Sequence, residues 1–164
     1  MRRAARPSGV RPSLAPGEAR RTRIGIIRAN YNAEITSSLE RKCVETLLAH
    51  GVPAANIERV EVPGCFEIPL AAQRLGVRKR FDALIALGAV IRGETHHFDL
   101  VANECARGVM DVMLRHNVPI IFEVLATYRK RDAIRRAASD RFNKGIEAAE
   151  AALAVIAALR EIRR

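Results

Sequence analysis

The sequence predicts a single α/β domain, a three-layer sandwich in which a four-stranded, mainly parallel sheet is flanked by helices. Short apolar runs alternate along the chain with longer segments of helical periodicity, which is the order of successive strand–helix–strand units. The run at residues 81–91 is apolar on both faces, as a strand covered by helices on both sides should be. The length of 164 residues suits one domain with its own core.

Four apolar runs are predicted as strands. The first is RIGIIRA at residues 23–29, and the second is IERVEVP at residues 57–63. FDALIALGAVI at residues 81–91 is the third, and VPIIFEVLA at residues 118–126 is the fourth. In a parallel sheet their carboxyl ends meet at one edge, and ligands bind at that edge in such folds.

Five segments are predicted as helices. Residues 33–50 carry apolar side chains at helical spacing, and Gly51 ends this helix. Pro69 suits the first turn of a second helix, which continues to Val77. The remaining helices are predicted at residues 98–116, about 130–138 and 143–161.

The first 22 residues are predicted as a disordered basic tail, and residues 23–164 as the folded domain. The chain has a net charge of +10, and seven arginines with one acid, Glu18, place +6 of it within residues 1–23. The tail is rich in Arg, Pro and Gly and has few apolar anchors. A solvated tail is the simplest interpretation, and contact with nucleic acid or another polyanion is an alternative. The Arg-rich, acid-poor composition also fits a transit peptide, although it shows no clear amphipathic helix.

Neither a membrane segment nor a disulfide framework is predicted. No apolar run reaches the roughly 20 residues that span a bilayer, and residues 1–21 lack the continuous apolar core of a signal peptide. The three cysteines, Cys43, Cys65 and Cys105, are widely separated and show no CxxC spacing. We therefore expect reduced thiols and a cytoplasmic protein.

The turn after the third strand, GETHHFD at residues 93–99, is the first candidate site. Gly93 allows a close backbone turn, and N–H groups at Glu94 and Thr95, just before a predicted helix, favour an anion such as phosphate. Thr95 is expected either to cap the helix or to bind the ligand directly. Neither GxxxxGK[ST] nor GxGxxG is present, so the turn is not a known nucleotide-binding loop.

The two adjacent histidines of this turn allow more than one interpretation. A metal site is the obvious one, but neighbouring side chains point in different directions, and neither HExxH nor a cysteine cluster supplies further ligands. His96 is interpreted as a surface residue. His97 suits proton transfer, because the positive end of a helix disfavours an imidazolium and keeps a neutral base available.

The segment PGCFEIP, residues 63–69, is a second candidate. Phe66 offers a stacking surface for a flat heterocycle, and Glu67 could read its polar edges. The alternative is that Phe66 fills the core. Tyr31 offers a similar aromatic face after the first strand.

The basic run at residues 129–145 is a third candidate. It is either a solvated helix face or, through Arg136 and Lys144, a source of two cations for the phosphate.

Taken together, PGCFEIP, GAVIRGETHHFD, VPIIFEVL and Arg136 followed by NKG resemble the 6,7-dimethyl-8-ribityllumazine synthase family. The resemblance runs from about residue 23 to residue 158. It implies a flavodoxin-like fold and the condensation of 5-amino-6-(D-ribitylamino)uracil with 3,4-dihydroxy-2-butanone 4-phosphate, which releases phosphate and water. This is the penultimate step of riboflavin biosynthesis, and the resemblance implies no cofactor and no metal.

The resemblance also implies roles for individual residues. His97 would shuttle protons, and Phe122 and Arg136 would reach into the site of a neighbouring subunit. The substrate-binding residues would be Tyr31, Phe66, Glu67, the backbone at Val90 and Ile91, and Phe122. The phosphate-binding residues would be Gly93, Glu94, Thr95, Arg136 and Lys144.

Assembly is a further implication of the resemblance. Members of the family form homopentamers with sites between subunits, and some pack pentamers into icosahedral shells. The connection from Arg136 to Lys144 is short, which favours a shell. A non-catalytic flavin- or lumazine-binding protein of the same fold is one alternative function. A nucleic-acid-binding module built on the tail is another, although the chain has no RNA-binding motif and only 4% aromatic residues.

Overall fold

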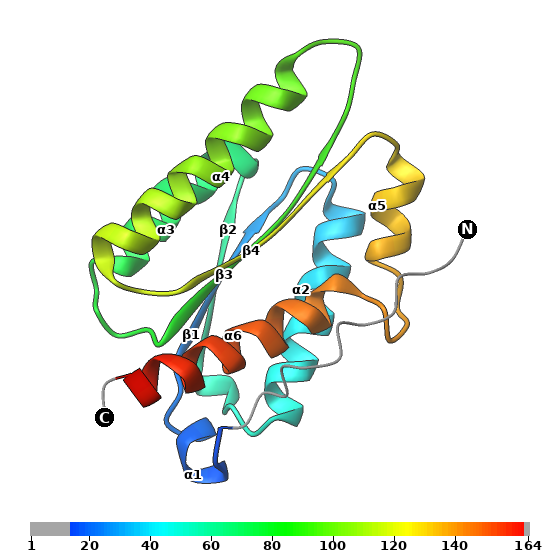
Figure 1. The fold of residues 1–164 in the computed structure, drawn as a ribbon. Helices are drawn as coiled ribbons and strands as arrows, with labels where there is room; N and C mark the ends of the chain where they lie inside the picture. Colours follow the sequence, from blue (N-terminus) through cyan, green and yellow to red (C-terminus); the bar gives the residue numbers. More distant parts are fainter. Residues whose placement is uncertain (1–13, 163–164) are drawn as a thin grey trace.

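A four-stranded parallel sheet forms the centre of the computed structural model, which describes residues 14–162 (Figure 1). Its strands are β1 (Ile24–Ala29), β2 (Ile57–Val62), β3 (Ala83–Ile91) and β4 (Ile120–Thr127). They lie in the order β2-β1-β3-β4, and all neighbouring pairs are parallel. The predicted sheet is therefore confirmed, with strand ends that differ from the predicted bounds by a residue or two.

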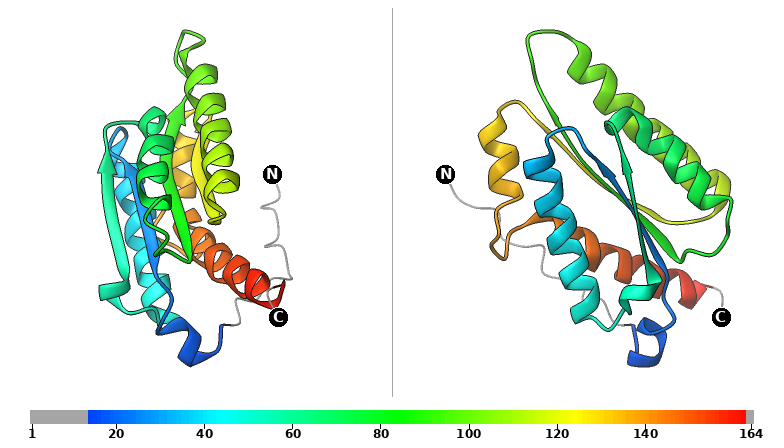
Figure 2. Two further views of the ribbon diagram at one scale, coloured as in Figure 1. Left: turned by 90° about the vertical axis from the view of Figure 1, so that its left-hand side faces the viewer. Right: turned by 180° about the vertical axis from the view of Figure 1, so that it is seen from behind.

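Helices cover both faces of the sheet, as predicted. One layer contains α2 (Ala33–Ala49), α5 (Lys130–Arg136) and α6 (Lys144–Ile162), and the other contains α3 (Ile68–Gly76) and α4 (His97–His116). Figure 2 shows the two layers from further directions. The described chain also has the short helical segments α1 (Pro16–Ala19), η1 (Ala54–Asn56) and η2 (Cys65–Glu67). None of the described helices is both long and apolar enough to cross a membrane.

Two hydrophobic cores, one on each face of the sheet, explain why β3 is apolar throughout. Ala83, Ile85 and Leu87 join the core beneath α2, α5 and α6, whereas Leu84 and Ala86 join the core beneath α3 and α4. Successive residues of a strand point to opposite faces, so a strand covered on both sides is apolar at every position. Fully burying one large aliphatic side chain contributes about 1.5–3 kcal/mol.

Arg28, at the penultimate position of β1, is a buried charged residue of the sheet. Its Nε lies 3.0 Å from the Glu40 carboxylate, and its Nη2 lies 2.5 Å from the Glu61 carboxylate. Its Nη1 donates to Asn30 Oδ1 at 3.3 Å and to Thr36 Oγ1 at 3.4 Å. A buried guanidinium is stable only with such partners. The cluster ties β1 to α2 and β2 just below the carboxyl edge of the sheet.

The residues predicted as a disordered tail divide into two parts. Residues 1–13 lie outside the described residues, so their predicted disorder stays a prediction. Residues 14–22 differ from the prediction, because they contain α1 and bury Ala19 and Thr22 against the domain. Thr22 Oγ1 donates to Glu18 O at 2.9 Å, and Arg160 of α6 lies 3.9 Å from the Glu18 carboxylate. Glu18 and Arg160 are far apart in the sequence, so the composition of the basic segment alone does not predict their contact.

Candidate active site at the carboxyl edge of the sheet

Most of the predicted site residues follow strands at the carboxyl edge of the sheet, where β1 and β3 are neighbours. β1 is followed by α2 on one face and β3 by α4 on the other, so their connections diverge. Such a divergence opens a crevice in which open α/β sheets bind ligands. The pairing of β3 with β1 ends at Leu87, whereas its pairing with β4 continues to Ile91. Within the described sheet, Val90 and Ile91 therefore have partners on β4 but none on β1.

The segment after β1 forms one wall of this crevice. Tyr31 is 74% exposed, and its backbone N–H donates to Pro63 O at 3.0 Å, which ties the exit of β1 to that of β2. Asn32 adopts a left-handed conformation with φ 60° at the start of α2, and its side chain donates to Ala89 O at 3.0 Å. These bonds hold the backbone while the Tyr31 ring stays exposed for stacking.

Phe66 and Glu67 lie in η2, which begins three residues after the end of β2. Phe66 is 58% exposed, so the alternative that it fills the core is wrong. Glu67 closes the turn, because one of its carboxylate oxygens accepts a hydrogen bond of 2.8 Å from the Gly64 N–H. The preceding Cys65 is buried, and burial raises its pKa to about 11, so it packs as a protonated thiol near neutral pH.

The connection between β3 and α4, residues 92–96, extends beyond the sheet edge (Figure 1). Gly93, Glu94 and Thr95 are exposed on it. Thr95 Oγ1 accepts a long hydrogen bond of 3.4 Å from the N–H of His97, the first residue of α4, although the N-cap of this helix is His96. The N-terminus of α4, a helix of 20 residues, opens here and offers its positive dipole end to an anion.

The two histidines of the turn differ in their surroundings. The side chain of His96 is 98% exposed, and its Nδ1 lies 3.5 Å from the Asp99 carboxylate. His97 is exposed at the first residue of α4. Within residues 14–162, no group of three or more His, Cys, Asp or Glu side chains is placed to hold a metal ion.

An aromatic and cationic cluster beside this turn was not anticipated from the sequence. The Arg92 guanidinium lies 5.4 Å from the centre of the Tyr128 ring, and the Phe98 and Tyr128 ring centres are 6.1 Å apart. The Arg92 N–H donates to Thr127 O at 2.9 Å, so the exits of β3 and β4 are joined. Tyr128 is 72% exposed, and its position directly after a predicted strand is the signal that could have found it.

Three predicted site residues lie away from this edge in a single chain. Phe122 is the third residue of β4, roughly 17 Å of strand before its carboxyl end. Arg136 ends α5, and its guanidinium donates to Asp132 O of its own helix at 3.0 Å. Lys144 begins α6 and forms an ion pair with Glu147.

A cavity of about 640 Å³ lies at the opposite, amino-terminal edge of the sheet, between the ends of α3, α4 and α6. Two of its cations are already paired within the chain, Arg80 with Glu58 and Arg160 with Asp82. Open α/β sheets bind their ligands at the carboxyl ends of the strands, whereas this cavity lies at the amino-terminal ends. The candidate site is therefore placed at the carboxyl edge, where the residues gather, rather than at this cavity.

Comparison with known proteins identifies the family of the chain. The family model described as 6,7-dimethyl-8-ribityllumazine synthase matches residues 21–160. The chain belongs to the 6,7-dimethyl-8-ribityllumazine synthase family. A protein of that name from Cytophaga hutchinsonii is 50% identical over 133 residues, which cover 81% of this chain and 84% of the relative.

Membership in the lumazine synthase family decides the class of chemistry. The three-layer sandwich is the family's flavodoxin-like fold, and the protein is an enzyme, a transferase of riboflavin biosynthesis. Enzymes of this family act on small-molecule substrates and assemble into oligomers. A non-catalytic flavin-binding role is not favoured.

Proposed function

We propose that the crevice between β1 and β3 is the active site in which this member of the family makes 6,7-dimethyl-8-ribityllumazine. The substrates are 5-amino-6-(D-ribitylamino)uracil and 3,4-dihydroxy-2-butanone 4-phosphate, and phosphate and water are released. One observation carries the proposal: Tyr31, Phe66, the end of β3 and the His97 turn gather at one edge of the sheet. Holding two substrates side by side supplies much of the rate of such a condensation.

The uracil substrate is assigned to the wall formed by the exits of β1 and β2. The exposed rings of Tyr31 and Phe66 offer faces for stacking on a flat pyrimidine. The backbone of Val90 and Ile91, beyond the last β1 pairing, is assigned to the ribityl chain. One Glu67 oxygen is bound to Gly64, and we assign the other to a ribityl hydroxyl.

The phosphate is assigned to the turn before α4. The amides of Gly93, Glu94 and Thr95 lie at the positive end of this helix, and the Thr95 hydroxyl can add a further bond. Only the amide of Glu94 contributes, because its carboxylate would repel the phosphate. Arg136 would complete the site from a second chain, and Lys144 would add positive charge nearby, since both lie away from this edge within one chain.

Proton transfer is assigned to His97. Imine formation, phosphate elimination and ring closure each require protons to be moved rather than a strong nucleophile. His97 is exposed at the first residue of α4, directly beside the proposed phosphate turn. A positioned general acid–base contributes about 10²–10⁴-fold.

A second copy of the chain is proposed to complete each site. Phe122 lies on the edge strand β4 and is 39% exposed, so its ring is available to a neighbouring chain. We propose homopentamers, and the short connection at residues 137–143 favours their packing into an icosahedral shell. A cytoplasmic location is supported by Cys43, Cys65 and Cys105, which are all free thiols.

The replacement His97→Ala tests this function. With both substrates supplied, the turnover of the variant should fall about 10²–10⁴-fold. Its melting temperature should stay that of the wild type, because His97 is exposed. Wild-type turnover in this variant would reject the catalytic assignment. Purified wild-type protein that absorbs as a flavoprotein and shows no turnover would support the binding-protein alternative instead.

A further inference from the structure

The connection between α5 and α6, residues 137–143, joins the two cations that the proposed function assigns to phosphate, Arg136 and Lys144. Both side chains are long and have many rotamers, so their reach depends on where the backbone beside them is held. A connection without regular structure would leave both ends loosely placed. In this chain, hydrogen bonds instead hold both ends of the connection against α2.

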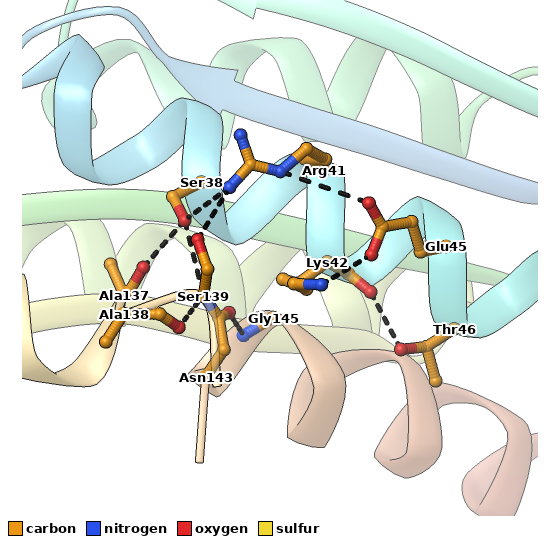
Figure 3. A network of polar contacts seen from close by, with 10 residues as sticks. All are labelled: Ser38, Arg41, Lys42, Glu45, Thr46, Ala137, Ala138, Ser139, Asn143 and Gly145. Atoms are coloured by element: carbon orange, nitrogen blue, oxygen red, sulfur yellow. Dashed lines mark hydrogen bonds and ion pairs between the residues drawn. The ribbon is translucent and has the colours of Figure 1, made fainter. Parts of the chain in front are cut away.

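Asn143 fastens the end next to Lys144. Its side chain is fully buried, with 0% exposure. The amide oxygen accepts a hydrogen bond of 2.8 Å from the Gly145 N–H, and the amide nitrogen donates to Ala138 O at 2.9 Å. The second bond spans the connection from its last residue to its second (Figure 3). A buried amide with these bonds holds the connection in one shape.

Ser38 of α2 fastens the end next to Arg136. Its hydroxyl donates to Ala137 O at 2.6 Å and accepts from Asn143 Nδ2 at 3.4 Å (Figure 3). Arg41, which follows Ser38 by almost one helical turn, donates to Ser139 Oγ at 3.0 Å. These are tertiary bonds between distant parts of the chain, so they act on the connection and not on α2 itself.

The first turn of α6 packs against the same part of α2. A Cβ at Gly145 would overlap the Leu39 carbonyl oxygen, so only glycine permits this approach. Leu39 follows Ser38, so adjacent residues of α2 hold both ends of the connection. The backbone groups held by these bonds are Ala137 O, directly after Arg136, Ala138 O, and the Gly145 N–H, directly after Lys144.

We propose that Ser38 and Asn143 are positioning residues for phosphate recognition. Their bonds set the backbone from which Arg136 and Lys144 extend, and so place both cations before the phosphorylated substrate arrives. Preorganisation of this kind improves affinity by reducing the ordering required on binding. The inference rests on the proposed function, because it takes the phosphate roles of Arg136 and Lys144 as given.

The replacement Ser38→Ala tests the inference, because it removes the hydroxyl from the connection and leaves both cations in the chain. We expect the KM for 3,4-dihydroxy-2-butanone 4-phosphate to rise about tenfold, since small misplacements of binding groups weaken binding strongly. The inhibition constant of inorganic phosphate should rise by a similar factor. The KM for the uracil substrate should stay within about twofold. Ser38→Thr keeps the hydroxyl and should restore wild-type values.

Thr46→Ala is the matched control. Thr46 lies on the same helix, and its hydroxyl donates to Lys42 O at 2.7 Å, within α2 rather than to the connection (Figure 3). Both KM values should be unchanged in this variant. Asn143→Ala should raise the KM for the phosphorylated substrate at least as much as Ser38→Ala does, and should likewise leave the KM for the uracil substrate nearly unchanged. Asn143→Ala also removes a buried amide and leaves its backbone partners without their hydrogen bonds, which lowers the stability of the fold. Ser38→Ala is therefore the decisive variant.

Arg136→Ala separates failure of the inference from failure of the proposed function. If Arg136→Ala raises the KM for the phosphorylated substrate and Ser38→Ala does not, the phosphate role stands and the positioning role is overturned. If Arg136→Ala itself leaves that KM unchanged, the phosphate assignment is wrong and the inference falls with it. A Ser38→Ala variant with a lower melting temperature and equal losses for both substrates has a merely structural defect, which also overturns the inference.

Discussion

His97 and Arg136 lie in different helix layers, on opposite faces of the sheet. His97 begins α4, which packs with α3 over one hydrophobic core, and Arg136 ends α5, whose Ala133 belongs to the other core. Arg136 also lies away from the carboxyl edge where His97 is found, and its guanidinium is bonded to Asp132 O of its own helix, so we expect the two side chains to meet at one substrate only when they come from different chains. An oligomer whose subunits meet across two different surfaces can bring them together, because each site then takes residues from two chains.

Subunit complementation should reveal this sharing. Oligomers assembled from His97→Ala and Arg136→Ala chains would contain some sites with an intact His97 from one chain and an intact Arg136 from the other. With random mixing, about a quarter of the sites would be intact. Co-expressed, differently tagged variants should thus recover about a quarter of wild-type activity at a low concentration of the phosphorylated substrate. Activity no higher than the mean of the two separate variants would contradict a shared site.

The replacement Gly93→Ala should weaken binding of the phosphorylated substrate without changing the stability of the fold. A Cβ at Gly93 would meet nothing within 4 Å, and its φ is not in the left-handed region. The free energy of unfolding should therefore stay within about 0.5 kcal/mol of the wild type. A methyl group on the proposed phosphate turn should nevertheless raise the KM for the phosphorylated substrate about tenfold, because it blocks close approach to the backbone.

Gly17→Ala is the control for this variant. Gly17 also has open space around its Cβ position, but it lies in α1, close to the opposite edge of the sheet. It should alter neither stability nor KM. An unchanged KM in Gly93→Ala would remove Gly93 from the phosphate site.

Glu123 should make the stability of the protein depend on pH. Burial raises its pKa from 4.5 to about 7, with Lys144 opposing and Glu147 adding to the rise. The native state then holds the proton more tightly than the unfolded chain does. The stability linked to this proton is fully present below about pH 4.5, is lost as the pH rises through 7, and amounts to at most about 3 kcal/mol.

Glu123→Gln should remove this dependence, because the amide does not ionise. Its free energy of unfolding should match the wild type near pH 4.5 and exceed it by up to about 3 kcal/mol at pH 8, measured by denaturant titration across that range. Glu161→Gln, the same change at the exposed end of α6, serves as the control. A constant difference between Glu123→Gln and the wild type from pH 4.5 to 8 would show that Glu123 is not the titrating group.

The strands and long helices could be read from the sequence because each pattern has one dominant physical cause. β3 is apolar at every position since both of its faces are covered, and the 33–49 helix carries its buried residues at helical spacing. α1 was missed because its stability depends on Thr22 and on Arg160 of α6, which no local pattern connects. The Arg92–Tyr128–Phe98 cluster was missed for the same reason.

The sequence by itself determined the alternation of strands and helices, the edge at which polar and aromatic residues collect, and the motifs that mark the family. Those features follow from local periodicity and from residue types at short spacing. Only the tertiary structure decided that Phe66 is exposed, that Asn143 is buried against Ser38, and that His97 and Arg136 fall in different layers. These depend on which distant segments pack together, and side-chain burial is set by that packing rather than by neighbours in the chain.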